Sequence, residues 1–170
     1  MRDERIGWSR RDVLKRLGAA SVSAAVGSGM VGRSRPATAQ GNLAALGPEE
    51  KVEATMQRLF GSRRMREDAA AVTVDLPLIA ENGAVVPITV EVQSPMTPAS
   101  HVKNIYVISD KNRRPMNAKF SLTPEAGAAW VGANLRLGES TDVRVVAELS
   151  DGALWMAKRH VKVTVGGCGG

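Results

Sequence analysis

The most reactive side chain in this sequence is that of its single cysteine, Cys168, which is the third residue from the end of the chain. Two glycines flank it on each side, Gly166 and Gly167 before it and Gly169 and Gly170 after it. A thiolate is a nucleophile that forms and exchanges disulfide-type bonds. Glycine has no Cβ and leaves the backbone free to adopt nearly any conformation. The pattern predicts a reactive thiol on a thin, flexible arm, residues 166–170, which can enter a narrow cleft of another protein.

Other catalytic and metal-binding patterns lack the residues that they need. One cysteine excludes an intramolecular disulfide, a tetrathiolate metal site and a covalent haem motif, and the sequence has neither a GxSxG nor a Walker motif. The only histidines, His101 and His160, lie far apart in the sequence. His160 and Lys162 are also too far along the chain from Cys168 to be assigned as activators of its thiol. The sequence therefore predicts no metal, no cofactor and no self-sufficient nucleophilic enzyme.

The first 39 residues have the form of an export signal. A start rich in arginine precedes residues 17–32, which carry no charge, and residues 37–39 read Ala-Thr-Ala, a pattern of signal cleavage sites. Cleavage after Ala39 leaves Gln40 as the first residue. The apolar run is too short and too rich in Gly, Ala and Ser for a good membrane span, so we expect no stable membrane insertion.

The arginine pair in this leader points to a particular export route. Residues 9–15 read Ser-Arg-Arg-Asp-Val-Leu-Lys, which resembles the twin-arginine motif S-R-R-x-F-L-K everywhere except at Val13. Arg10 and Arg11 are then the twin arginines, and the mature protein is expected in the periplasm. The motif resembles the signal of the twin-arginine pathway, which carries folded proteins, sometimes with a partner already bound. A lone thiol in an oxidising compartment crosslinks or is oxidised unless something uses it.

The basic character of the chain belongs to the leader. The whole sequence has a formal net charge of +6. Residues 1–39 hold eight of its 23 Lys and Arg residues and three of its 17 Asp and Glu residues, so residues 40–170 hold 15 and 14 and a net charge of +1. A nearly neutral mature domain argues against nucleic acid as a partner.

The mature domain, residues 40–165, is expected to be mainly β: an immunoglobulin-like antiparallel β-sandwich with one short N-terminal helix. Pro48 and Gly61 bound a helix over residues 47–61, and Val52, Met56, Leu59 and Phe60 form its apolar stripe. Short runs rich in Val, Ile and Leu then recur between turn residues. Seven strands are predicted, over residues 72–78, 86–92, 102–108, 118–122, 129–135, 142–149 and 153–165.

Two dipeptides, Asn82-Gly83 and Asp151-Gly152, predict tight reversals with positive φ. In the last strand, Leu154 and Met156 are apolar in one phase, whereas residues 161, 163 and 165 are valines in the other. That change predicts a bulge or a change of sheet at residues 158–160. Trp130 and Trp155 are expected to be core or interface anchors.

Four features together resemble the SoxY family, the sulfur-carrier subunit of the periplasmic thiosulfate-oxidising system. They are the twin-arginine leader, the phrase Ala-Glu-Asn-Gly-Ala-Val-Val-Pro-Ile-Thr-Val at residues 80–90, Ser-Asp-Gly at residues 150–152, and the terminal Gly-Gly-Cys-Gly-Gly. The resemblance implies a substrate carrier and not an enzyme, with Cys168 as the attachment site. It also implies a heterodimer with SoxZ and loading by the haem enzyme SoxAX. SoxB then releases sulfate, and SoxCD, where present, oxidises the remaining sulfur.

Two readings from other classes stay open at this point. Proteins that end in Gly-Gly can carry sulfur as a C-terminal thiocarboxylate on a ubiquitin-like fold, although export and the neighbouring Cys168 argue against it. A structural sandwich protein crosslinked through Cys168 would need a stable dimer and no sulfur adduct. An incidental unpaired cysteine does not explain the symmetric glycines.

Overall fold

The computed structural model describes residues 47–167. The predicted leader, with Arg10, Arg11 and the cleavage site at Ala39, therefore lies outside the described residues, as do Cys168, Gly169 and Gly170. Among the described residues, no helix is long and apolar enough to cross a membrane.

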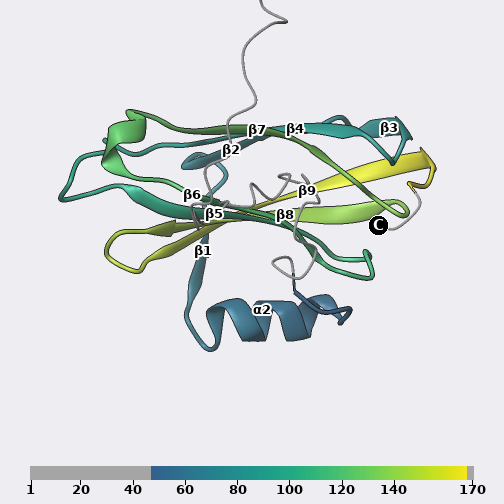
Figure 1. Cartoon of the computed structure of the whole chain (residues 1–170), viewed down its shortest axis with the longest axis horizontal. Helices are drawn as coiled ribbons and strands as arrows, with labels where there is room; N and C mark the ends of the chain where they lie inside the picture. The colour runs from purple at the N-terminus through teal and green to yellow at the C-terminus, as the bar shows by residue number, and fades with distance from the viewer. Residues whose placement is uncertain (1–46, 168–170) are drawn as a thin grey trace, which may run out of the picture. The chain divides into compact units, whose positions relative to one another are not determined.

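Two β-sheets pack face to face, and a helix covers the outer face of one of them (Figure 1). The larger sheet has the strand order β1-β9-β8-β5-β6, with β3 also pairing with β9, and the smaller sheet has the order β2-β4-β7. The chain order is α2 (Val52–Phe60), β1 (Met65–Glu67), β2 (Val72–Asp75), β3 (Ile79–Asn82), β4 (Val86–Val92), β5 (Val102–Ser109), β6 (Met116–Ser121), the 3-10 turn η2 (Pro124–Ala126), β7 (Ala129–Leu135), β8 (Thr141–Leu149) and β9 (Leu154–Val165). The predicted immunoglobulin-like sandwich is confirmed.

The main core lies between the two sheets and follows the period-2 pattern of the strands. In β4, every second residue from Val86 to Val92 is buried, and these residues face Val143, Val145 and Ala147 of β8. Because successive side chains of a strand point to opposite faces, alternation in the sequence places one whole face of each strand in this core.

Helix α2 forms a second, smaller core on the outer face of the large sheet (Figure 1). Its Val52 and Phe60 pack with Tyr106, Ile108, Met116, Val146, Leu154 and Met156. The helix is shorter than the predicted 47–61, since it begins at Val52 and ends before Gly61, whose φ is 59°. Residues 47–51 are not helical: the Glu50 N–H donates to the Arg113 carbonyl at 3.1 Å, and Gly47 has a φ of 90°.

The predicted bulge at residues 158–160 is wrong, because the pairing of β8 with β9 runs from Glu148–Leu154 to Thr141–Val161 without a register shift. A change of partner follows directly after it, since residues 162–165 of β9 pair with β3. Leu154 and Met156 face α2, whereas Ala157 and Val161 face the main core. The apolar phase changes along β9 because the strand has a hydrophobic layer on each side, and α2 covers only the first part of its outer face.

All seven predicted strands exist, with small shifts at their ends, but two short strands were not predicted. These are β1 and β3, and both pair with β9 in parallel, β1 beside its start and β3 beside its end. Each has at most one buried side chain. A strand without an alternating apolar face gives no periodic signal, so only the tertiary pairing reveals it.

Glu148 of β8 joins the connection between α2 and β1 to strand β5 of the large sheet. Its carboxylate accepts hydrogen bonds from Asn104 Nδ2 at 2.9 Å and from the Tyr106 hydroxyl at 3.1 Å, and it pairs with Arg63 at 2.9 Å. Its side chain is only 14% exposed. Burial raises the pKa of Glu148, but the bonds from Asn104, Arg63 and Tyr106 outweigh burial and hold the pKa below its ordinary value.

We expect Glu148→Gln to destabilise the protein by about 1–3 kcal/mol near neutral pH. The carboxylate accepts hydrogen bonds on both of its oxygens, whereas the side-chain NH2 group of a glutamine would face a hydrogen-bond donor and could not accept. The lowered pKa means that the carboxylate stabilises the fold above its unfolded-state pKa and loses this effect as the pH falls through the folded pKa. Urea unfolding near neutral pH and near pH ~3 should therefore show the difference between variant and wild type shrinking in acid. Glu139→Gln, in an exposed pair with Lys111 at 3.7 Å, is the control and should cost little. A stability difference between Glu148→Gln and the wild type that does not change with pH would contradict the stabilising role of the Glu148 carboxylate.

Candidate functional site

The last described residues, Gly166 and Gly167, follow the end of β9, at the end of the sandwich where β9 lies beside β3. Strand β9 runs the length of the large sheet, and its last residues lie beside β3, with Asn82 paired to Val165 (Figure 1). The turn between β3 and β4 and the loop between β7 and β8 meet the chain at this point. The predicted attachment residue, Cys168, follows directly after Gly167 in the sequence.

Four backbone-to-backbone contacts hold the chain at this end. The Gly83 N–H donates to the Val165 carbonyl at 2.7 Å, the Leu137 N–H donates to the Gly83 carbonyl at 2.7 Å, and the Gly167 N–H donates to the Leu137 carbonyl at 2.9 Å. Gly166 lies against the backbone of Gly138. We call the end of the sandwich from which the chain continues to Cys168 the exit. The exit clamp is the set of residues that make these contacts: Gly83, Leu137, Gly138, Gly166 and Gly167.

Glycine is required in the clamp because the backbones approach so closely. A Cβ on Gly83 would overlap the Leu137 carbonyl oxygen, and one on Gly166 would overlap the Gly138 carbonyl oxygen. A Cβ on Gly167 would lie 2.6 Å from the Gly83 carbonyl oxygen. These separations are below those that real Cβ atoms show, so a larger residue would force the strands of backbone apart.

The structure changes the interpretation of two predicted features. The sequence predicts an arm that begins at Gly166, whereas Gly166 and Gly167 lie in backbone contact with the sandwich, and Gly167 is buried. The expected positive φ at Asn82-Gly83 is wrong, because Gly83 is not among the described residues with positive φ. A turn does form there, with the Ala84 N–H donating to Asn82 Oδ1 at 2.9 Å, but Gly83 is needed for close approach. The other expected reversal, at Asp151-Gly152, is confirmed, with a φ of 87° at Gly152.

Sequence reasoning did not include Gly83, Leu137 or Gly138 in the site. The Asn-Gly pair signalled a turn, but nothing in the sequence indicates that this turn meets the loop after β7. The pentapeptide and its partners in the clamp are far apart along the chain, and only folding brings them together.

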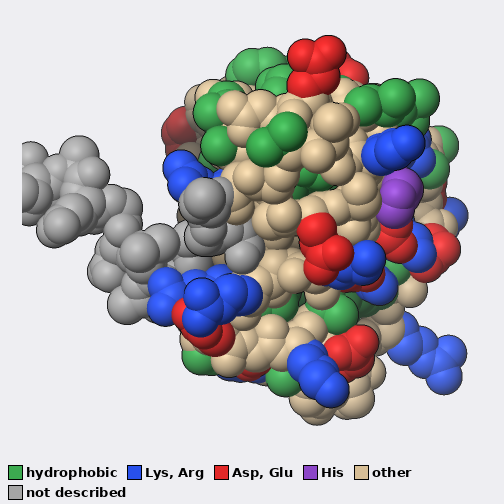
Figure 2. Space-filling view, turned by 90° about the vertical axis from the view of Figure 1, so that its right-hand side faces the viewer, with side chains coloured by type: hydrophobic (Ala, Val, Ile, Leu, Met, Phe, Trp, Pro, Cys, Tyr) green, Lys and Arg blue, Asp and Glu red, His purple; other side chains and the backbone are tan. Residues whose placement is uncertain are grey.

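Exposed aliphatic side chains lie on β3 and around its ends. They are Leu78, Ile79, Val85 and Val165, each between 58% and 78% exposed. Figure 2 looks onto this end of the molecule, where hydrophobic side chains gather in the upper part and charged side chains are spread over the middle, the right and the lower part. The surroundings of the exit thus combine these aliphatic side chains with exposed charged ones, among them Glu81 on β3 and Glu139 beside Gly138.

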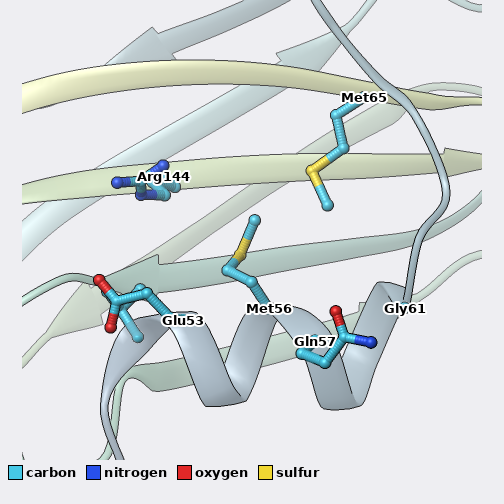
Figure 3. A pocket seen from close by; sticks show the side chains of 7 residues that line it. Glu53, Met56, Gln57, Gly61, Met65 and Arg144 are labelled. Atoms are coloured by element: carbon cyan, nitrogen blue, oxygen red, sulfur yellow. The ribbon is translucent and has the colours of Figure 1, made fainter.

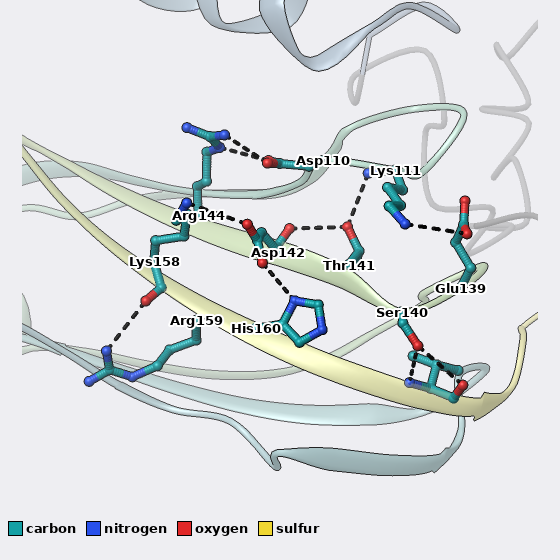
Figure 4. Close-up of polar contacts among 11 residues, drawn as sticks. Asp110, Lys111, Glu139, Ser140, Thr141, Asp142, Arg144, Lys158, Arg159 and His160 are labelled. Atoms are coloured by element: carbon teal, nitrogen blue, oxygen red, sulfur yellow. Dashed lines mark hydrogen bonds and ion pairs between the residues drawn. The ribbon is translucent and has the colours of Figure 1, made fainter.

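The histidine nearest the C-terminus is bound elsewhere. His160 Nδ1 lies 2.7 Å from Asp142 Oδ1 on the outer face of β8 and β9, beside Lys158 (Figure 4). The hydrogen bond from His160, aided by Lys158, holds the pKa of Asp142 below its ordinary value. Among residues 47–167, no three His, Cys, Asp or Glu side chains lie close enough to hold one metal ion. His160 therefore belongs to a group of charged residues on the outer face of β8 and β9, together with Asp142 and Lys158, and not to the exit.

A pocket of about 320 Å³ lies between α2 and the large sheet, lined among others by Met56, Met65 and Arg144 (Figure 3). Arg144 is already held by Asp110 through two hydrogen bonds of 2.7 Å. Met65 pairs with Leu154, the first residue of β9, whereas the exit clamp lies beyond the last. The pocket is thus at the opposite end of β9 from the exit.

Comparison with known proteins decides the family. The model of the family described as sulfur oxidation protein SoxY matches residues 56–168. The chain belongs to the SoxY family. The solved structure of the sulfur carrier protein SoxY from Chlorobium limicola f thiosulfatophilum is 33% identical, with a TM-score of 0.56, and the match covers 68% of this chain and 97% of that one. The predicted family is confirmed, and a sulfur-carrier role is supported.

Similarity to other solved structures concerns the fold alone. A superoxide reductase (neelaredoxin) from Ignicoccus hospitalis has a TM-score of 0.50 at 19% identity, over 55% of this chain and 80% of that one. No curated protein sequence matches the chain. The SoxY-family match runs from α2 to Cys168 and so includes every residue of the exit clamp.

Proposed function

We propose that this SoxY-family protein carries sulfur intermediates covalently on Cys168 and presents them to separate enzymes. The observation that carries the proposal is that the family match extends to Cys168, the only thiol of the chain. A sulfur carrier needs one thiol that several active sites can reach in turn. A cysteine between two glycine pairs at the end of a strand meets that need with the least steric obstruction.

Loading of the thiol is an oxidation. The thiol loses its proton, a bond forms between its sulfur and the outer sulfur of thiosulfate, and the two electrons released pass to a haem enzyme of the SoxAX type. A hydrolase of the SoxB type then adds water to the sulfone sulfur. Sulfate leaves, two protons are released, and the outer sulfur remains on Cys168 as a persulfide anion, Cys–S–S⁻. A SoxCD-type enzyme, where present, oxidises that sulfur further.

The surroundings of the exit favour a carrier that depends on partner enzymes. The described residues that form the exit clamp are held through backbone groups, and of the titratable side chains near this end of the chain, Glu139 pairs with Lys111 and His160 with Asp142. We assign proton transfer and electron acceptance to the partner enzymes, as the SoxY-family resemblance implies. Cys168 itself supplies only the sulfur to which the substrate is joined.

We also propose a heterodimer with a SoxZ-like subunit and a periplasmic location after twin-arginine export. Trp130 is 57% exposed on β7, the edge strand of the small sheet, so it is not the core residue that the sequence allowed. An exposed tryptophan beside a free strand edge suits a protein interface. Residues 1–39 have the sequence pattern of the export signal that this proposal requires.

Mass spectrometry of protein from thiosulfate-grown cells tests the proposal. Trypsin cuts after Lys162 and releases residues 163–170, which contain Cys168. We expect this peptide to carry the mass of added sulfur or of thiosulfonate, and a reducing agent should remove it. The intact protein from the periplasmic fraction should begin at Gln40. An unmodified peptide in cells that oxidise thiosulfate would refute the carrier role.

The same measurement separates the alternatives. A protein crosslinked through Cys168 would give a disulfide dimer without added sulfur. A thiocarboxylate would place the mass on the Gly170 carboxyl group and would survive Cys168→Ser. The ubiquitin-like fold that the thiocarboxylate reading requires is not the fold of this chain, which is a two-sheet sandwich.

A further inference from the structure

We propose that the exit clamp is a positioning device that makes Gly167, and not Val165, the fixed point from which Cys168 is presented. The inference deepens the proposed function and rests on it. Its basis is the set of hydrogen bonds that join Gly83, Leu137 and Gly167, together with the overlaps that a Cβ on Gly83 or Gly166 would create. A flexible tail that only linked Cys168 to the sandwich would need neither these hydrogen bonds nor glycine at positions 83 and 166.

The clamp is anchored to the rigid part of the sandwich. The Leu137 side chain is fully buried in the main core, so the loop that accepts the Gly167 N–H cannot move without disturbing that core. Leu137 therefore connects the end of the chain directly to the interior of the protein. The Asn82 side chain supports the other wall by accepting the Ala84 N–H.

A buried amide braces the loop on both sides of Leu137. Asn112, in the loop between β5 and β6, donates from Nδ2 to the Arg136 carbonyl at 2.7 Å and accepts the Gly138 N–H on Oδ1 at 3.1 Å. It also donates to Asn117 Oδ1 at 3.0 Å. Asn112 thus makes bonds to the residues immediately before and after Leu137. We assign it as a second positioning residue, which contacts neither the tail nor Gly83 in these bonds.

The clamp shortens the reach of the thiol. If Val165 were the last fixed residue, Cα of Cys168 could lie about 10 Å away, whereas with Gly167 fixed it lies about 3.8 Å from Cα of Gly167. A shorter reach confines the thiol to a small volume at one end of the sandwich. The cysteine then loses less conformational freedom when an enzyme, the loading enzyme included, binds it, which favours binding. Loss of the clamp should therefore raise KM for the carrier more than it lowers kcat.

Residue-specific amide exchange tests the clamp without using the carrier function. In the wild-type protein, the Gly167 amide should exchange at least about tenfold more slowly than in an unfolded peptide. Gly83→Ala should remove this protection, as should Asn112→Ala, while the amide of Val145 in the main core stays within about twofold. An unprotected Gly167 amide in the wild type, or one whose protection survives both substitutions, would overturn the proposal.

Loading kinetics test the consequence. With the purified loading enzyme and thiosulfate, Gly83→Ala and Asn112→Ala should each raise KM for the carrier by about tenfold and leave kcat within about twofold. Alkylation of Cys168 by iodoacetamide should not change, because a small reagent needs no fixed position. Gly152→Ala is the matched control: its φ of 87° makes the same change costly in a turn at the other end of β9. Its KM should equal that of the wild type.

The outcomes separate the two proposals. A rise in KM that Gly152→Ala shares would mean general destabilisation and would refute the positioning role, as would an unchanged KM in both clamp variants. If Gly83→Ala fails to fold, Gly167→Ala replaces it, since its overlap can be relieved by moving only the last residues away from the sandwich. A wild-type protein that is never loaded would refute the proposed function, while the exchange of the Gly167 amide would still decide whether the clamp exists.

Discussion

Cys168→Ser should reduce thiosulfate-dependent electron transfer in a reconstituted system to the background level without carrier. The substitution exchanges one side-chain atom, sulfur, for the smaller oxygen, and a serine hydroxyl is neither ionised near neutral pH nor able to form the sulfur–sulfur bond that holds the substrate. The sequence offers no second thiol that could replace it. The measurement is electron transfer per carrier, followed by mass analysis of residues 163–170.

The fold supplies the control for this substitution. Residue 168 lies beyond the last strand, so its replacement should leave the denaturation midpoint unchanged, because changes outside packed regions cost within about 0.5 kcal/mol. Co-purification with the partner subunit should also be unchanged. Turnover that persists in Cys168→Ser would show that sulfur is carried elsewhere. A large loss of stability would show that Cys168 has a structural role.

Phe60→Ala should lower the free energy of unfolding by about 3–5 kcal/mol, a large share of the ~5–15 kcal/mol that keeps a domain folded. Phe60 is 3% exposed and packs edge-on against Tyr106, with the ring centres 5.1 Å apart and the planes at 86°. Removal of this ring leaves a cavity in the small core between α2 and the large sheet and removes an aromatic contact. Denaturant unfolding monitored by circular dichroism measures the loss.

Leu59→Ala is the matched control, because Leu59 precedes Phe60 on the same helix and is only partly buried against the same core. Its substitution should cost clearly less than that of Phe60. If the two cost the same, the small core would not depend on the specific packing of Phe60. Neither change should alter alkylation of Cys168, because α2 lies over the start of β9 and the exit clamp lies beyond its end.

Much of the fold could be predicted from periodicity, and the misses share a cause. The strands with an alternating apolar face were all predicted, and two of them, β4 and β7, have the predicted ends. The strands β1 and β3 were missed because they are short and nearly all exposed. The false bulge in β9 arose because a phase change within one strand usually signals irregular pairing, and the sequence does not reveal that α2 covers one part of the outer face.

The local sequence by itself marked Cys168 as the proposed attachment residue. A single thiol between glycine pairs can be recognised locally, because reactivity belongs to a residue type and its immediate neighbours. Only the tertiary structure decided how Gly166 and Gly167, the residues before that cysteine, are held. The clamp joins Gly83, Leu137 and Gly167 from three separate parts of the chain through backbone groups, which every residue possesses and which therefore leave no trace in the sequence. The sequence marks the glycines, but the close approaches that require Gly83, Gly166 and Gly167 exist only after the two sheets have packed together.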